Sequence, residues 1–498
     1  MSDVLFGQSY YLRFDPKLWE AMQPYPPLGS LYAASYVRQK GYTVAFYDAM
    51  LAESVAEWVS ALDQHRPKYV VLFEDNFNYL SKMCLLRMRE AAFQMAEAAK
   101  ARGCMVIISG SDATDHAEKY FAHGVDYIII GEGEITLGEL LDSLAGQSDL
   151  PREAILGLSW PEAEGIHRAP ERPFLKELDQ FPFPAWELVD IPRYQKIWHE
   201  RHGYYSMNMV TTRGCPYRCN WCAKPIYGRR YNSRSPENVV AELKWLKDNF
   251  APDHIWFADD IFGLKPGWIV KFSELAQAQD AAVPFKCLQR VDLIKEGVAE
   301  ALRGAKCKTV WMGAESGSQK ILDAMDKDTR VEDIYQAAEL LHQVGIEVGF
   351  FLQFGYPGEG WEDIQKTLAM VRRCQPDDIG ISVSYPLPGT KFYENVKLQL
   401  GEKTNWEHSD DLAMLYQGPF AQDFYRVLHH RVHHEFRARK AFRQVTDALK
   451  QPTTLRPGHI RQAVSIPVNL ARLVKSSSKL KQLARVEHET GALNPQRT

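Results

Sequence analysis

The sequence contains no uninterrupted apolar stretch as long as the roughly 18 to 20 residues that a membrane-spanning helix needs. The first residues, MSDVLFGQSYYLRFDPK, also lack the basic end, the apolar stretch and the cleavage site of a secretory leader. Internal repeats and low-complexity tracts are missing as well. These absences argue against an integral membrane protein and against a repeat protein, and we expect a globular protein in the cytoplasm.

Cysteine is also scarce, with eight residues in a chain of 498. Five of the cysteines are scattered and lie mostly in apolar runs: Cys84, Cys104, Cys287, Cys307 and Cys374. This distribution predicts reduced, buried thiols and excludes a disulfide framework. The remaining three, Cys215, Cys219 and Cys222, fall within eight residues of the stretch TTRGCPYRCNWCAKPIYGRRY.

The chain is large enough to bury more than one core. Single cores stop growing at about 250 to 300 residues, so we expect two or three domains. The net charge of −4 hides an asymmetry, because residues 424–485 contain fourteen Lys or Arg and only two acids. The C-terminal region therefore differs chemically from the rest of the chain.

Residues 1–147 alternate short apolar runs with amphipathic stretches. The predicted strands are DVLFGQSY, TVAFYDA, KYVVLFE, CMVIISGS and DYIIIG, and the predicted helices cover 28–40, 54–64, 80–101, 113–123 and 135–145. This alternation predicts an α/β fold with a doubly wound, Rossmann-like parallel sheet. Such sheets bind ligands beyond the carboxyl ends of their strands, where the loops PYPPLGS, SGSDATD and GEGE are rich in small residues. For any one loop alone, ordinary turn and cap residues are the simpler interpretation.

Residues 148–203 predict a small β unit and an ordered linker. From 204 to 395 the alternation resumes with six strand and helix units, which predicts a complete or partial (β/α)6 barrel with its active face at the loops that follow the strands. Residues 396–498 lack strand signals and predict two amphipathic helices. The second predicted helix sets Ile466, Leu470, Leu473, Val474, Leu480 and Leu483 opposite Arg472, Lys475, Lys479 and Lys481.

The three clustered cysteines can converge on one metal centre, because they lie in a loop that leaves the first barrel strand. Structural zinc needs four closed ligands, and here the fourth would come from a remote His or Cys. A [4Fe–4S] cluster held by three thiolates instead keeps one iron open to another ligand. Four histidines at 429, 430, 433 and 434 could also hold a metal, although we interpret them as a solvated helix face.

The spacing C-x-x-x-C-x-x-C, with Trp221 before the last cysteine, resembles the signature of the radical S-adenosylmethionine (SAM) enzymes. The resemblance implies that Cys215, Cys219 and Cys222 hold a [4Fe–4S] cluster whose fourth iron is chelated by SAM. Reductive cleavage of SAM then yields a 5′-deoxyadenosyl radical. The segments ADDIF, LQRVD, MGAESGS and FGYPGE match the family pattern in order. They imply SAM contacts at Trp221, Asp259, Arg290, Glu315, Ser316 and Gly355.

The N-terminal region resembles the cobalamin-binding domain that precedes the barrel in one large subfamily, so the resemblance covers residues 1–395. It implies cobalamin contacts at Pro27, Leu28, Gly29, Gly110, Ser111, Gly131, Glu132, Gly133 and Glu134. The D-x-H-x-x-G motif, whose His binds cobalt from below in other cobalamin proteins, is missing after the first strand. The resemblance then implies a lower cobalt face without a protein imidazole.

The resemblance implies an enzyme that uses the adenosyl radical on an unactivated carbon, with cobalamin-dependent C-methylation as the first hypothesis. Radical cyclisation, oxidation or rearrangement is the alternative, and a non-catalytic iron–sulfur or corrinoid-binding sensor is a further one. The expected partners are a small-molecule substrate and a reductant such as flavodoxin or ferredoxin. No nucleic-acid-binding module accompanies the basic charge, so we expect no nucleic acid partner.

Substrate contacts are expected at Tyr217, at 225–231, at 384–390 and on the helical tail. The tail itself has two interpretations. It is either a solvated surface that packs on its own domain, or a face that docks on an anionic membrane, which would imply a lipid-like substrate.

Overall fold

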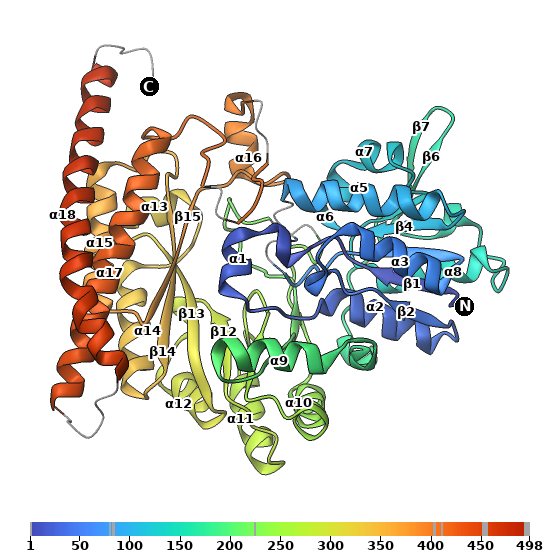
Figure 1. Ribbon diagram of the computed structural model, residues 1–498, viewed down its shortest axis with the longest axis horizontal. Helices are drawn as coiled ribbons and strands as arrows, with labels where there is room; N and C mark the ends of the chain where they lie inside the picture. Colours follow the sequence, from blue (N-terminus) through green and yellow to red (C-terminus); the bar gives the residue numbers. More distant parts are fainter. Residues whose placement is uncertain are drawn as a thin grey trace.

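The computed structural model describes residues 2–78, 81, 85–223, 226–401, 405–409, 412–450 and 457–492, the side chains of 457 and 485–492 excepted. Figure 1 shows an N-terminal α/β unit, a second sheet surrounded by helices, and two long C-terminal helices on the far side of that second sheet. The domain boundaries at 147, 203 and 395 stay predictions.

The first sheet has seven strands in the order β2-β1-β3-β4-β5-β6-β7. The first five are parallel: β1 (Val4–Gly7), β2 (Val44–Phe46), β3 (Tyr69–Phe73), β4 (Met105–Ser109) and β5 (Tyr127–Ile129). Helices cover both faces, so the central strands are buried throughout and read as continuous apolar runs. The predicted doubly wound sheet is confirmed.

The predicted small β unit is a hairpin of β6 (Leu158–Glu162) and β7 (Gly165–Arg168). It pairs antiparallel with β5 and extends the first sheet. The small β unit is therefore present, but it belongs to the N-terminal sheet and is not part of a separate linker.

The helices of the first unit are α1 (Pro16–Ala21), α2 (Leu28–Gln39), α3 (Val55–His65), α5 (Leu86–Lys100), α6 (Ser111–Asp115), α7 (Ala117–Ala122) and α8 (Glu134–Leu144). α2 packs with α8, and α3 packs with α5. The single helix predicted at 113–123 is wrong, because the chain bends at His116, where ψ is 38°. The bend lets Tyr120 on α7 donate to Asp112 on α6 at 2.7 Å. The start predicted at Leu80 for the helix observed as α5, like Cys84, lies outside the described residues.

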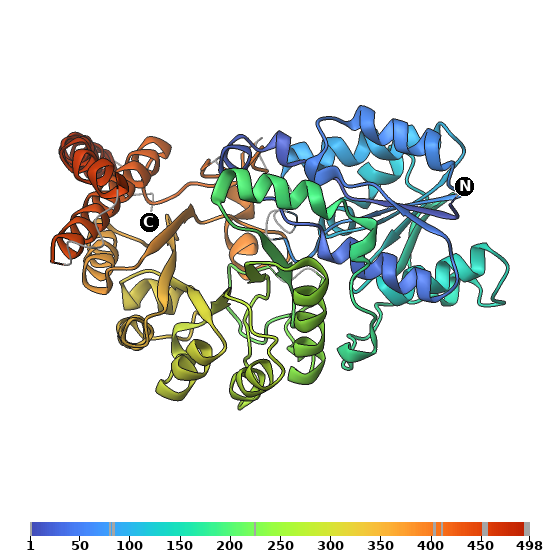
Figure 2. The same ribbon diagram turned by 60° about the horizontal axis from the view of Figure 1, so that its bottom comes forward.

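The connecting helix α9 (Ile191–His202) is capped by Asp190 and ends at Gly203, which has a positive φ of 76°. α9 contacts both units. Trp198 Nε1 donates to the Pro24 carbonyl at 2.8 Å, and Gln195 Nε2 donates to the Phe250 carbonyl at 3.1 Å. Figure 2 shows α9 lying across the two units.

The second sheet has six parallel strands in the order β15-β14-β13-β12-β11-β8. Its strands are β8 (Ser206–Met209), β11 (His254–Phe257), β12 (Phe285–Gln289), β13 (Cys307–Glu315), β14 (Glu347–Phe354) and β15 (Asp378–Val383). The helices between them are α10 (Pro236–Phe250), α11 (Trp268–Ala278), α12 (Glu296–Gly304), α13 (Gln319–Ala324), α14 (Val331–Gln343) and α15 (Trp361–Cys374), and α16 (Lys391–Val396) follows β15. β8 and β15 stand at opposite edges, so this is the predicted partial (β/α)6 barrel.

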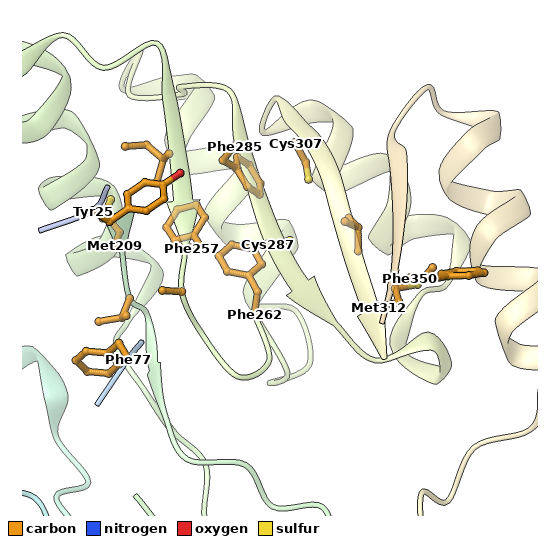
Figure 3. Close-up of a cluster of buried hydrophobic side chains, with 14 of the residues drawn as sticks. Tyr25, Phe77, Met209, Phe257, Phe262, Phe285, Cys287, Cys307, Met312 and Phe350 are labelled. Atoms are coloured by element: carbon orange, nitrogen blue, oxygen red, sulfur yellow. The ribbon is translucent and has the colours of Figure 1, made fainter. Parts of the chain in front are cut away.

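The core of the barrel lies between its strands and its outer helices. Phe257, Phe262 and Phe285 contact one another edge to face or tilted, and Figure 3 shows them beside the buried Cys287. Cys104, Cys307 and Cys374 are also buried thiols. The predicted reduced, buried character is therefore confirmed for the four described cysteines outside the clustered three.

The C-terminal region forms two long helices, α17 (Gln422–Lys450) and α18 (Pro457–Ala492), which pack against each other beside α15. Arg372 on α15 forms an ion pair with Glu435, and Arg443 forms one with Asp377 at 2.9 Å. The predicted helical C-terminal region is confirmed, and its two helices form a hairpin. None of the described helices combines the length and the apolar character needed to cross a bilayer.

Candidate functional site

The three clustered cysteines lie in a loop at the carboxyl end of β8. The two-residue strands β9 (Thr212–Arg213) and β10 (Asn232–Ser233) pair antiparallel and close the base of this loop. Gly214 follows β9 with a φ of 78°, and a side chain there would collide with the carbonyl oxygen of Arg230. Glycine is required at this position for both reasons. Cys219 is buried, whereas Cys215 and Cys222 are partly exposed.

Asn220, a buried residue that sequence reasoning missed, fastens the cysteine loop to the barrel. Its side-chain amide donates to the Ala324 carbonyl at 2.7 Å, and its Oδ1 accepts from the Tyr356 hydroxyl at 2.7 Å. Its backbone N–H donates to the Met325 carbonyl, and its carbonyl accepts from Phe392. These four bonds, with a fifth from the side-chain amide to Asp326 at 3.0 Å, fix the chain directly after Cys219 to three segments. The only sequence signal was a polar residue between two cysteine-motif positions.

Two cations approach Cys219. Arg290 Nη1 lies 4.0 Å from the Cys219 sulfur, and the guanidinium stacks 3.5 Å from the Tyr217 ring centroid. Lys327 Nζ binds Glu315 at 2.9 Å. Burial opposes the charge of Lys327, but Glu315 and Cys219 outweigh it and raise the pKa of the ammonium. These charges complement the negative charge that a metal-bound thiolate carries.

Glu315 ends β13 in a strained conformation. Its φ is 56°, and Ser316 N–H bonds back to the Ala314 carbonyl at 2.7 Å, which makes Glu315 the centre of a γ-turn. The register between β13 and β14 shifts at this point. Positive φ in a residue with a side chain is costly, and such strain concentrates at functional sites. The strained residue is the acid that the sequence singled out.

Of the other predicted SAM residues, Ser316 and Gly355 have partners within the protein, whereas the indole N–H of Trp221 has none in the described structure. The Ser316 hydroxyl bonds the Thr367 hydroxyl at 3.1 Å on α15. Gly355 has a φ of 83°, and its N–H donates to Glu359 at 2.6 Å. Trp221 Nε1 is buried and has no hydrogen-bond partner within the described protein. Contact of SAM with these residues stays a prediction.

Asp259 accepts four hydrogen bonds from Thr211 and Thr212, at 2.7 to 3.0 Å. Burial raises the pKa of Asp259 to about 6, and these bonds oppose the rise. Both carboxylate oxygens are used, so the role that the structure gives Asp259 is to position the chain that leads into the cysteine loop. Direct contact between Asp259 and SAM stays a prediction.

The donor types of the cysteine loop fit an iron–sulfur cluster. Three thiols stand in one short loop, with two cations close to the buried one. Within the described ranges, no three His, Cys, Asp or Glu side chains are arranged to hold a single metal ion. In a cubane cluster each thiolate binds a different iron, so the sulfurs stand farther apart than ligands around one ion. The three thiols and the nearby cations therefore suit the cluster, and the ligand set of Cys215, Cys219 and Cys222 stays a prediction.

The nine predicted cobalamin residues all lie at the carboxyl edge of the first sheet. Pro27 precedes α2, Gly110 follows β4, and Gly131 to Glu134 follow β5. A side chain at Gly110 would approach Glu74 to 2.9 Å, and one at Gly133 would approach Phe73 to 2.8 Å. These two glycines are thus required by packing within the protein. Packing alone explains Gly110 and Gly133, without a ligand that needs the space beside them.

Glu134 joins the two units. It forms a two-bond ion pair with Arg213 at 2.6 and 3.2 Å, and both side chains are at most 5% exposed. Arg213 stacks against Phe181 and Tyr227, with its guanidinium about 5 Å from each ring. Since Arg213 lies two residues before Cys215, this pair ties the cysteine loop to the loop after β5.

Three buried polar atoms along the same edge lack a partner in the described protein: Tyr10 Oη, Ser109 Oγ and Glu132 Oε1. Glu132 uses its other oxygen to accept from Leu175 N–H at 2.8 Å. Burial raises the pKa of Glu132 to about 7. Buried polar groups normally have partners, so these atoms fit an edge that receives a polar ligand such as a corrinoid.

The carboxyl edge of the first sheet faces the cysteine loop of the barrel. Tyr227 stacks on Phe77 with ring centroids 5.3 Å apart, and Arg234 donates to the Tyr32 hydroxyl at 3.0 Å. The position of a side chain on Gly131 would lie 4.0 Å from the Ile226 carbonyl. Contacts from α2 and from the loops after β3 and β5 therefore bring the two predicted cofactor sites together.

Two solved structures share this architecture. The cobalamin-dependent SAM radical enzyme OxsB, with aqua-cobalamin and SAM bound, superposes with a TM-score of 0.69 at 18% identity over 98% of this chain and 72% of that chain. The radical SAM methyltransferase TsrM from Kitasatospora setae, with cobalamin and a [4Fe–4S] cluster, gives 0.64 at 18% identity over 80% of this chain and 75% of that one. At this identity the likeness shows the fold alone.

Three curated relatives match at similar identity. An uncharacterized methyltransferase of Pyrococcus horikoshii is 27% identical over 375 residues, which cover 74% of this chain and 78% of the relative. The anaerobic magnesium-protoporphyrin IX monomethyl ester cyclase of Rubrivivax gelatinosus is 26% identical over 391 residues, 76% and 67% of the two chains. The hopanoid C-3 methylase of Methylococcus capsulatus is 25% identical over 385 residues, 75% and 69%.

Two family models match the chain in the order that the sequence predicted. The model of the B12 binding domain matches residues 19–141, and that of the Radical SAM superfamily matches residues 209–371. The first match covers Ser109 and Glu132 at the sheet edge, and the second covers the cysteine loop and β13. The chain therefore contains a B12-binding domain at residues 19–141 followed by a Radical SAM domain at residues 209–371.

Proposed function

We propose that this protein is a cobalamin-dependent radical SAM enzyme that methylates an unactivated carbon of a small molecule. The observation that carries the proposal is the direct contact between the cysteine loop and the carboxyl edge of the B12-binding domain, through Arg213 and Glu134. When bound, a [4Fe–4S] cluster with SAM supplies the radical, and cobalamin supplies the methyl group. The protein contributes the arrangement of the two sites.

The residues of the cysteine loop have defined tasks in this proposal. Cys215, Cys219 and Cys222 hold the cluster. Arg290 offsets the negative charge of that centre, and so does Lys327, which in turn holds the carboxylate of Glu315. The five bonds of Asn220 keep the loop from moving when the charge of the centre changes.

SAM contacts are proposed at Trp221, Arg290, Glu315, Ser316 and Gly355. Trp221 offers an unpartnered donor, and the strained turn at Glu315 holds backbone groups in a geometry that a relaxed strand would not adopt. Asp259 acts indirectly on the site, because its carboxylate accepts hydrogen bonds from Thr211 and Thr212.

Cobalamin contacts are proposed at the sheet edge formed by Pro27, Leu28, Gly29, Gly110, Ser111, Gly131, Glu132, Gly133 and Glu134. Within this set, Glu132 has the free acceptor atom, and Glu134 holds the interdomain ion pair. The chain after β1 has Gln8 and Ser9 where a lower-face histidine would stand, and Ser9 N–H binds Glu74 at 3.1 Å. The lower face of the corrin is thus proposed to lack an imidazole ligand.

The inner side of the barrel indicates the class of substrate. Side chains alternate along a strand, and Phe257, Phe285 and Cys287 point outward to the helices, so Trp256 and Leu288 point inward. Trp311 is the register partner of Leu288, and it stacks on Phe351 with centroids 4.8 Å apart.

This inner wall is apolar and open. Phe351 is 40% exposed, although it lies in a central strand. Gly349 and Gly380 stand beside Trp311 and Phe351, and a side chain at Gly349 would collide with the Trp311 ring. Lys286, whose pKa burial lowers to about 8, lies 5.1 Å from the Trp256 ring. We therefore propose a lipid-like or other largely apolar substrate with few polar groups.

The same two sites could serve a radical cyclisation without methyl transfer, and one of the relatives is a cyclase. A non-catalytic sensor would need the cluster but no reaction. Isotope-labelled SAM separates these functions, because only the methyltransferase moves a labelled methyl group into a product.

The test uses protein purified without oxygen and reconstituted with iron, sulfide and cobalamin. We expect cluster and corrin bands in the absorption spectrum, 5′-deoxyadenosine from SAM under reductant, and labelled methyl groups in the organic extract of a cell lysate supplied as substrate. SAM cleavage without label transfer would instead support cyclisation or rearrangement. No SAM cleavage by protein that carries a complete cluster would support the sensor.

Two partners complete the proposal. Reduction of the cluster requires a one-electron donor such as a flavodoxin or ferredoxin. An apolar substrate in the cytoplasm would be met at a membrane surface, so the proposal includes peripheral membrane contact by the basic C-terminal region.

A further inference from the structure

Exposed apolar side chains gather on the two C-terminal helices. In the described part of the chain, eleven large apolar side chains are at least 36% exposed, and seven of them belong to α17 and α18. They are Phe442, Leu449, Ile460, Val464, Val468, Leu470 and Val474. The barrel and the first sheet together hold only four, so this concentration marks one surface and not a general property of the molecule.

The exposed apolar side chains of α18 do not coincide with its predicted apolar face. Leu480 is buried, and Ile466, Leu473 and Leu483 are half-buried in the contact with α17 and its surroundings. Val474, predicted to belong to that packed face, is instead 71% exposed. The prediction of a single apolar face is therefore wrong, because α18 carries two.

The second face is a continuous strip along the helix. Ile460, Val464, Val468, Ala471 and Val474 follow one another at steps of three and four residues, which places them on one side of an α-helix. All five are exposed. We call this strip the outer ridge.

Positive charge lies on both sides of the outer ridge. On α18, the exposed cations are Arg461, Arg472, Lys475, Lys479 and Lys481. Between residues 458 and 484 the sequence contains no acid. On the other side, a groove of about 780 Å³ between α15, α17 and α18 runs from Leu470 and Phe442 to Arg439, Arg443 and Lys450. These three cations form ion pairs with Glu435, Asp377 and Asp447, so the cations of α18 are the ones available to headgroups.

We propose that the outer ridge, together with Phe442 and Leu470 at the edge of the groove, docks on an anionic membrane surface. An apolar strip bordered by Lys and Arg is the pattern of a helix that lies in the membrane interface. The apolar side chains enter the boundary between headgroups and acyl chains, and the cations meet the negative headgroups. The groove beside the ridge can accept part of a lipid.

A second copy of the chain fits this surface less well. A two-fold contact through the ridge would bring the acid-free cations of one copy against those of the other. Like charges at that distance oppose association. The charge pattern therefore favours lipid headgroups as the occupant.

This inference rests on the membrane contact included in the proposed function and names the residues that make it. It can nevertheless be tested without cofactors or catalysis. Full-length protein is mixed with vesicles of phosphatidylcholine, with or without phosphatidylglycerol, and sedimented. We expect binding to the vesicles that contain phosphatidylglycerol, weaker binding at high salt, and little binding to phosphatidylcholine alone.

Two variants locate the contact. Val464→Asp combined with Val474→Asp breaks the ridge, and Lys475→Glu combined with Lys479→Glu reverses charge beside it. Each pair should weaken vesicle binding by about tenfold or more. Val270→Asp on α11, where the valine is 43% exposed, is the matched control and should bind as the unchanged protein does. Circular dichroism checks that all variants are folded.

Three results would overturn the inference: no binding to anionic vesicles, equal binding by the ridge variant and the control, or a dimer in sedimentation velocity that only the ridge variant loses. Because SAM cleavage is measured separately, loss of vesicle binding leaves the proposed chemistry standing. Absence of radical chemistry likewise leaves the membrane contact standing.

Discussion

The cysteine loop and helix α18 both carry several cations, but they hold them in opposite ways. At the cysteine loop, Lys327 is paired with Glu315 and Arg213 with Glu134, and each of these four side chains is at most 7% exposed. On α18, Lys475 and Lys479 are exposed, and that helix contains no acid between residues 458 and 484. A buried charge must have its partner, whereas an exposed one acts together with its neighbours. Mutations should therefore separate the two regions clearly.

The largest expected effect is at the cysteine loop itself. Cys219→Ala should remove cluster iron and sulfide and lower SAM cleavage to background, because the cluster loses one of its three protein ligands. Iron analysis and the yield of 5′-deoxyadenosine measure both effects. Cys287→Ala, in the barrel core, is the matched control and should keep its iron. Unchanged iron content in Cys219→Ala would refute the proposed ligand set.

The second-largest effect is expected at the buried ion pair of Lys327 and Glu315. Lys327→Met leaves Glu315 buried without its cation, and we expect a loss of roughly 3 to 5 kcal/mol in the free energy of unfolding. Lys320→Met is the comparison, because Lys320 pairs with Asp363 but is 64% exposed, and its loss should cost less than about 1 kcal/mol. Urea denaturation of the cofactor-free protein measures both. Equal losses would contradict the distinction between buried and exposed charge.

Glu359, a buried acid with no ion pair in the described structure, provides a further test of the difference between buried and exposed charge. Burial raises the pKa of Glu359 from 4.5 to about 8, and its bond from Gly355 N–H only partly opposes this. Between these two pKa values, the folded protein keeps a proton that the unfolded chain releases. The stabilisation from this buried acid is therefore complete below pH 4.5 and is lost as pH rises through about 8.

Glu359→Gln removes this titration. We expect the variant and the unchanged protein to differ little in melting temperature at acidic pH, and the variant to be more stable by a few degrees above the folded pKa. Differential scanning calorimetry across the pH range measures the divergence. A difference that does not depend on pH would show that Glu359 does not titrate in this range.

The smallest effect on stability is expected on the hairpin. Lys479→Ala should change the free energy of unfolding by less than about 0.5 kcal/mol, because an exposed side chain far from a partner contributes little. Its vesicle binding should nevertheless fall severalfold. Urea denaturation and sedimentation of the same preparation test both statements. A large loss of stability would place Lys479 in the fold and not in the docking surface.

The fold could be predicted because its signals are local. Strands of a parallel sheet that are covered on both sides read as apolar runs, and the helices between them read as amphipathic stretches. The doubly wound sheet, the partial barrel and the helical C-terminal region followed from this pattern. The clustered cysteines are local in the same sense, since their spacing alone lets them meet at one centre.

The roles of single charged residues could not be predicted in this way. Glu134 stood among the expected cobalamin residues, yet it binds Arg213, which lies 79 positions away. Asp259 stood among the SAM residues, yet its oxygens are taken by Thr211 and Thr212. Asn220 and Lys327 were missed altogether. Nothing in the residues next to them tells which distant group will be in reach.

The hairpin shows the same limit for apolar residues. The spacing of α18 supports an apolar strip on either of two sides, and only the position of α17 decides which one is covered. The sequence by itself determined the strands, the helices and the group of three thiols, because these depend on periodicity and spacing along the chain. Tertiary structure alone decided which charges are paired, which glycines are crowded and which apolar face stays open, because these depend on distances between segments far apart in the chain.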